Sequence, residues 1–182
     1  MEKFSGSWAN RFIIAAIIQG GIITGITIII VASQLAFAEQ NIIRFLSLSF
    51  EGPAKWFFIG YIFYLILTVA VAVTAVFYNH LELNLKKRFK GASRVLAWIH
   101  LVGMNVGAAG ANILMILAGL SGSGALGMVL GSAKGSIDVA EGIAVLDSFI
   151  IPIASFIGIL GIGVICGGVA YILAYRMKSE VV

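Results

Sequence analysis

The sequence predicts an all-α integral membrane protein, a four-helix bundle with both chain ends on the inner side of the membrane. Hydrophobic residues make up 60% of the 182 residues, charged residues only 11%, and the mean hydropathy is +1.07. An ordinary soluble domain carries roughly 25% charged residues. A soluble domain of this size could not bury so much apolar surface. Soluble enzymes, nucleic-acid binders and disulfide-rich secreted proteins are therefore excluded.

Charged residues divide the chain into four long neutral stretches. A spanning helix needs about 20 apolar residues, and a backbone in lipid has few alternatives to a helix. Residues 1–182 are thus expected to form a single transmembrane domain, with helices over residues 12–38, 56–81, 95–119 and 148–175.

The first helix, over residues 12–38, contains 27 residues without a charge. This run is longer than the apolar core of a signal peptide, which has about 7–15 residues. Residues 41–50 after it carry an amphipathic pattern, which suits a short helix lying on the membrane surface.

The second helix, over residues 56–81, begins after Pro53 and carries Tyr61, Tyr64 and Thr68 along one stripe. These three side chains are expected to pack against neighbouring helices, and lining a quinone pocket or a proton path is the alternative. The third helix is expected to end near Gly119, because the rest of its neutral stretch is rich in glycine and serine.

The fourth helix, over residues 148–175, is again uncharged. None of the four predicted spans contains Asp, Glu, Lys or Arg, whereas proton-coupled transporters and voltage sensors normally need such residues there. No motif of a hydrolase or of a phosphate-binding loop is present.

The orientation follows from the Lys and Arg residues. With the N-terminus inside, nine of the 12 lie in inner segments and three in outer segments. The positive-inside rule therefore predicts cytoplasmic N- and C-termini in the cell membrane. The basic cluster between Lys86 and Arg94 is the main topology signal and suits anionic lipid headgroups. Docking of a partner or an acidic substrate is the alternative.

His80 and His100 are the principal candidate site residues. His80 precedes Lys86 by six positions and His100 follows Arg94 by six. The short link between helices 2 and 3 predicts antiparallel neighbours, which places both imidazoles at similar depth. Neutral imidazole is a ligand for iron, copper or zinc. Two histidines do not complete a tetrahedral zinc site, but they supply both axial ligands of a haem.

Gly103 and Gly107 share a helical face with His100, and this face without side chains suits a flat cofactor. The cofactor expected there is haem b, bound by His80, His100, Gly103 and Gly107. Close helix packing is the alternative explanation of the glycines, since Gly163 and Gly167 on the fourth helix have the same spacing without a histidine. A structural or interfacial role is the alternative for His80 and His100.

The stretch from Trp98 to Gly107, WIHLVGMNVG, resembles the histidine-bearing helices of haem–copper oxidase catalytic subunits. Residues 60–65 and 77–82 of the second helix also look like short four-helix proteins found beside archaeal respiratory oxidases. The resemblance implies that His80 and His100 are ligands. A full oxidase subunit has about a dozen helices and six metal-binding histidines, so the resemblance extends to a one-haem fragment or an accessory subunit.

Two functions follow as the main hypotheses, and a third is a small-solute channel or carrier, for which no charge within the spans marks a pathway. The first is a b-type haem electron-transfer protein or oxidase-associated subunit, with quinone or a respiratory oxidase as redox partner. The second is a non-catalytic accessory subunit of a larger membrane complex without a cofactor. Both place the chain among membrane lipids and within an oligomer or complex, and neither involves nucleic acid.

Overall fold

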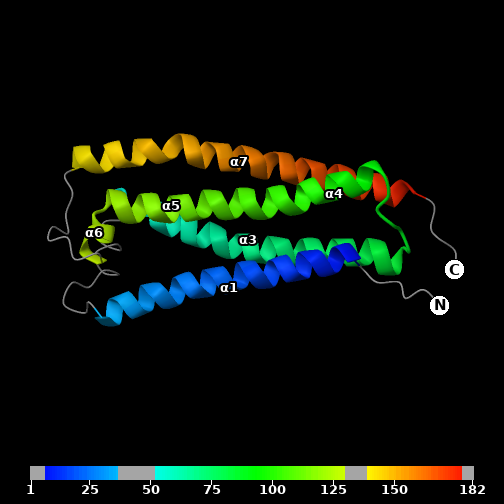
Figure 1. The fold of residues 1–182 in the computed structure, drawn as a ribbon, viewed down its shortest axis with the longest axis horizontal. Helices are drawn as coiled ribbons and strands as arrows, with labels where there is room; N and C mark the ends of the chain where they lie inside the picture. Colours follow the sequence, from blue (N-terminus) through cyan, green and yellow to red (C-terminus); the bar gives the residue numbers. More distant parts are fainter. Residues whose placement is uncertain (1–6, 37–51, 130–138, 178–182) are drawn as a thin grey trace. The chain divides into compact units, whose positions relative to one another are not determined.

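The structure, a computed structural model, describes residues 7–36, 52–129 and 139–177. Within these ranges the chain is helical apart from turns and one link, and it contains no strand. The elements, with η marking a π-helical turn, are α1 (Ser7–Ala36), α3 (Lys55–Asn79), η1 (His80–Asn84), α4 (Ala92–Val102), η2 (Gly103–Gly107), α5 (Ala108–Gly122), α6 (Ala125–Val129) and α7 (Val139–Arg176) (Figure 1).

Four helical segments of the described residues are long and apolar enough to cross a membrane. They run over Trp8–Ser33, Lys55–Asn84, Ala92–Gly122 and Ala140–Arg176. The prediction of an all-helical chain with four helices of spanning length is therefore confirmed. The amphipathic segment predicted at residues 41–50 lies outside the described residues.

The loop predicted after Gly119 is wrong at both of its ends. The third span continues to Gly122, the short helix α6 follows, and α7 begins at Val139 rather than at residue 148. The acidic residues Glu141 and Asp147 are exposed on the first turns of α7, where a negative charge near a helix N-terminus is favourable. A charge thus marks the end of an apolar run without marking the end of a helix.

The contacts of the chain divide it into two compact units. Unit 1 comprises residues 1–20, 66–109 and 156–182, and unit 2 comprises residues 21–65 and 110–155. Each unit contains parts of the same four long helices.

Unit 2 has its core where α3 meets α5. Phe57, Ile116, Ala54 and Ala125 are buried there, and Tyr61 packs against them. The hydroxyls of Thr27 and Tyr61 are 2.8 Å apart, which ties α1 to α3.

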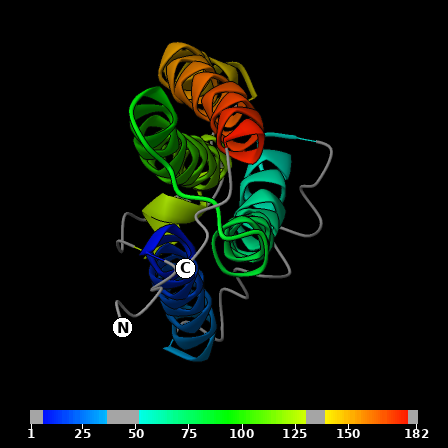
Figure 2. The same ribbon diagram turned by 90° about the vertical axis from the view of Figure 1, so that its right-hand side faces the viewer.

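Unit 1 is held by a close approach between η2 and α7. A Cβ atom on Gly103 would lie 2.9 Å from the Cα atom of Gly163, and one on Gly107 would lie 2.9 Å from the Cα atom of Leu160. Figure 2 looks along the helices of this unit, with the end of α7 beside α4. Helices in lipid associate through such small-residue contacts because burial from water does not drive them together.

Candidate functional site

His100 lies on α4 in the interior of unit 1, with only 8% of its surface exposed. Its Nδ1 atom is 3.0 Å from the hydroxyl of Tyr78 on α3. The ring of Phe12 on α1 lies 5.1 Å from the imidazole, measured between centroids. One histidine therefore joins the side chains of three helices.

Gly167 of α7 also packs against the imidazole ring. A Cβ atom at this position would overlap the imidazole ring. The glycine at residue 167 is thus required by the close packing of α7 on His100. This explains the repeat of glycines that the fourth helix shares with the third.

His80 has a different environment. It begins the π-helical turn η1, it is exposed, and its Nδ1 atom lies 3.0 Å from the side-chain nitrogen of Asn84. Within the described part of the chain, His80 and His100 have separate hydrogen-bond partners and none in common. Joint ligation of a haem by the two residues stays a prediction.

The glycine face beside His100 faces α7. Gly103 and Gly107 are buried in η2 against the backbone of α7. The helical face on which a cofactor was expected is therefore used for helix packing. The described residues also contain no group of three or more His, Cys, Asp and Glu side chains that could hold a metal ion.

A pocket of about 540 Å³ is lined by His100 and by residues of α3, η2 and α7. Tyr78 and His100 form part of its wall, together with Met104. α7 also contributes to the lining, through Gly167, which is packed on the imidazole, and Gly168, where an added Cβ atom would meet nothing within 4 Å. The remaining lining residues are Thr74, Phe77, Val164, Tyr171 and Ile172.

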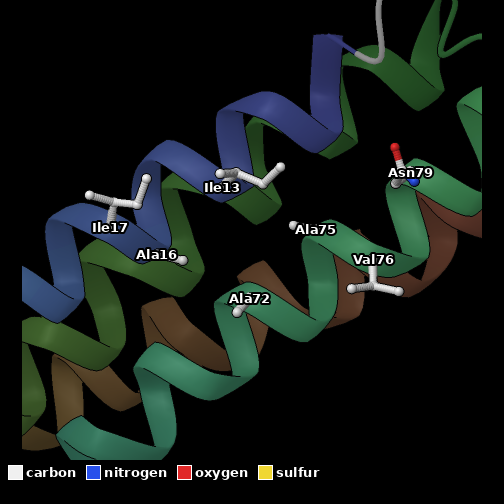
Figure 3. A pocket seen from close by; sticks show the side chains of 7 residues that line it. All are labelled: Ile13, Ala16, Ile17, Ala72, Ala75, Val76 and Asn79. Atoms are coloured by element: carbon white, nitrogen blue, oxygen red, sulfur yellow. The ribbon is translucent and has the colours of Figure 1, made fainter.

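A second pocket, of about 500 Å³, lies between α1 and α3 in unit 1. Figure 3 shows the α1 residues of its lining, Ile13, Ala16 and Ile17, together with those of α3. Its lining is apolar apart from Asn79; the other α3 residues are Ala72, Ala75 and Val76. A groove of this kind suits a lipid acyl chain.

Glu82 corrects the expectation that the spans contain no acidic residue. The second span continues through η1 to Asn84, and Glu82 within it is only 6% exposed. Its carboxylate accepts hydrogen bonds from the backbone N–H groups of Trp8, at 3.1 Å, and Ala9, at 3.2 Å. The first N–H groups of a helix have no partner within the helix, so Glu82 serves as the cap of α1 from a distant part of the chain.

An aromatic cluster surrounds this cap. It consists of Trp8, Phe12, Tyr78, Phe89 and Trp98. The rings of Tyr78 and Phe89 stack with their centroids 4.8 Å apart, and Trp8 meets the edge of Trp98 at 5.3 Å. Trp8 is almost fully buried in this cluster.

Arg11 lies over two rings of the aromatic cluster. Its guanidinium carbon is 4.4 Å from the ring of Trp8 and 4.7 Å from the ring of Trp98. A cation over a ring face is attracted by about 0.5–2 kcal/mol, depending on how far it is desolvated. The positive charge therefore helps to hold α1 against α4.

The basic link between η1 and α4 is anchored at several points. Phe89 is buried, Lys87 Nζ donates to the backbone oxygen of Met177, and Ser93 Oγ donates to the oxygen of Lys90. Lys86 and Arg88 are exposed. The anchored link thus presents basic side chains outward, as a surface for anionic headgroups requires.

The other polar residues of the spans hold helices together. Gln19 Nε2 donates to Asn105 Oδ1 at 3.0 Å, which ties α1 to η2. Asn112 and Tyr64 are buried. With Tyr61 bonded to Thr27, helix packing accounts for the polar stripe of the second helix.

No protein-family model, no curated protein and no solved structure matches this chain.

Proposed function

We propose that this chain is a non-catalytic helical subunit of a larger membrane complex. The observation that carries the proposal is that the polar side chains of its spans are used in contacts between its own helices. The pairs are Glu82 with the start of α1, Gln19 with Asn105, Thr27 with Tyr61, and His100 with Tyr78. Such pairs stabilise helix association and leave few groups for a reaction.

The glycines supply a surface for assembly. Gly103, Gly107, Gly163 and Gly167 are in close contact within the chain, whereas Gly21 and Gly25 of α1 have no atom within 4 Å of an added Cβ. Gly21 and Gly25 are four residues apart and lie on one helical face, together with the exposed Ile28. Small residues at this spacing allow the backbone of another helix to approach closely.

A respiratory oxidase is the class of partner that the sequence favours. The support is the resemblance of residues 98–107 to oxidase helices and of the second helix to proteins found beside archaeal oxidases. A subunit of this kind would dock through α1 and contribute no redox centre of its own.

Photo-crosslinking in native membranes tests the assembly. A photoreactive residue in place of Ile28, which is 62% exposed, should capture a defined partner subunit, whereas one in place of Ile23, which is 4% exposed, should not. Gly21→Leu should abolish the crosslink, because its side chain would block the approaching helix. Ile29→Leu, at another exposed position of α1, is the control without a volume change. A monomer that crosslinks to no subunit contradicts the proposal.

Haem binding is the second candidate function. It is favoured by His100, whose Nε2 atom has no hydrogen-bond partner among the described residues. Ligation by both histidines requires the exposed His80 to turn inward and bind through Nε2, since its Nδ1 atom is bonded to Asn84. Reduced-minus-oxidised spectra of the purified chain, expressed with ample haem, test this function. A Soret band that is lost in both His80→Ala and His100→Ala would support it, and the absence of any band would exclude it.

The orientation belongs to the same proposal. The Lys and Arg distribution supports cytoplasmic N- and C-termini in the cell membrane. The basic link from Lys86 to Arg94 then faces the anionic inner leaflet.

A further inference from the structure

The pocket beside His100 holds a hydrogen-bonding group that helix packing does not use. His100 Nδ1 and the hydroxyl of Tyr78 share one hydrogen bond. Neutral histidine has one N–H donor and tyrosine has one O–H donor, so this single bond consumes one of two donors. Either His100 Nε2–H or the Tyr78 hydroxyl proton remains available.

When the Tyr78 hydroxyl donates to His100 Nδ1, the available donor is the Nε2–H group. In the described part of the chain, every fully buried side-chain nitrogen and oxygen atom has a hydrogen-bond partner. His100 Nε2 has no such partner, and therefore part of its surface is exposed. Since His100 lines the pocket, a ligand there can accept a hydrogen bond from the His100–Tyr78 pair.

The walls of the pocket indicate the shape of the ligand. On the α7 side, Gly167 is packed on the imidazole of His100, whereas an added Cβ atom on Gly168 would meet nothing within 4 Å. The aromatic residues Phe77 and Tyr171 also line the pocket. A flat ring beside Gly168 gains contact with these aromatic side chains. All lining residues belong to the helices of spanning length, which suits a lipid-soluble ligand.

We propose that this pocket binds the head ring of a lipid-soluble quinone. A carbonyl oxygen of the ring accepts the hydrogen bond from the His100–Tyr78 pair, and the apolar tail lies along α7 in the bilayer. A haem is less well suited, because His100 is the one histidine of the lining and a second axial ligand would have to come from outside it. The proposal concerns binding, and it does not depend on assembly into a complex.

The test is a titration of the purified chain in detergent with decylubiquinone, followed by quenching of tryptophan fluorescence. Decylbenzene, which has the ring and tail but no carbonyl, competes against it. Decylubiquinone should quench saturably, and decylbenzene should displace it only at concentrations at least about ten times higher, as the loss of one hydrogen bond of about 1.4 kcal/mol implies.

Two variants locate the site. Gly168→Leu fills the pocket, yet a Cβ atom at residue 168 meets nothing within 4 Å, so the helix packing is retained and the affinity should fall at least about tenfold. His100→Phe keeps an aromatic ring and removes the hydrogen-bond donor. This variant should weaken the binding of decylubiquinone and leave the binding of decylbenzene unchanged. Val169→Leu, at an exposed neighbouring position, is the control and should bind normally.

Three results would overturn the proposal. Equal affinity for the two ligands would identify the pocket as a groove for acyl chains. Unchanged affinity in Gly168→Leu would place the quinone elsewhere. A Soret band in the purified chain that disappears in Gly168→Leu would identify haem as the occupant.

Discussion

Glu82 is the residue on which the start of α1 depends. Its carboxylate accepts hydrogen bonds from two N–H groups at the positive end of the α1 dipole. A carboxylate in the interior is retained only where such bonds replace the lost water. The residue therefore couples the end of the second span to the beginning of the first.

Replacing Glu82 by glutamine should lower the free energy of unfolding by about 1 kcal/mol, because the amide oxygen can still accept the hydrogen bonds but lacks the charge that strengthens them. Thermal unfolding in detergent, followed by tryptophan fluorescence, measures the change, since Trp8 lies beside the cap. Asp147→Asn, at an exposed position of α7, is the matched control and should change stability little. An equal effect of the two substitutions would mean that Glu82 does not cap α1.

The helix pair formed by η2 and α7 shows how a π-helical turn serves close packing. The turn from Gly103 to Gly107 is one of the wider turns that often interrupt a helix at a specialised position. It presents both glycines to the backbone of α7 and leaves Asn105 to bond with Gln19 of α1. One short element thereby contacts the helices on two sides.

Gly107→Ala should destabilise unit 1 by about 1–3 kcal/mol, because the added methyl group meets the backbone of Leu160 and Phe156. Gly161→Ala is the matched control on α7, where an added Cβ atom meets nothing within 4 Å. The midpoints of thermal unfolding of the two variants give the comparison. If Gly107→Ala is as stable as Gly161→Ala, the close approach of η2 and α7 is incorrect.

At the scale of the whole molecule, the outward surface of the long helices is apolar. Isoleucines such as Ile17 and Ile29 of α1 and Ile151 and Ile165 of α7 are more than 60% exposed. In water such a surface would aggregate, whereas in a bilayer it is the surface that lipid requires. The distribution of exposed apolar residues therefore agrees with an integral membrane protein.

Accessibility to a membrane-impermeant maleimide tests the orientation. In a Cys166→Ala background, which removes the one cysteine of the sequence, a cysteine introduced by Lys55→Cys should be labelled in intact cells. One introduced by Lys90→Cys should react only after the cells are permeabilised. Both positions are exposed, so the membrane alone distinguishes them. The reverse pattern would invert the proposed topology.

The sequence by itself determined how many helices of spanning length the described chain contains and about where they lie. The length of an apolar run and the charges at its ends are local properties of the sequence. They predict spans directly, because the thickness of the bilayer sets the length of helix that can cross it. The same local rule placed the start of α7 too late in the sequence. Glu141 and Asp147 interrupt the apolar run, but both lie within the α-helix.

Only the tertiary structure decided which side chains meet. His80 and His100 occupy matching positions relative to the flanking charges, yet one is exposed beside Asn84 and the other is buried beneath Gly167. Glu82 finds its partners 74 residues away in the sequence. Periodicity identifies the helical face on which a residue lies. Which helix packs against that face depends on the packing of all the helices, and this packing also forms the pocket beside His100.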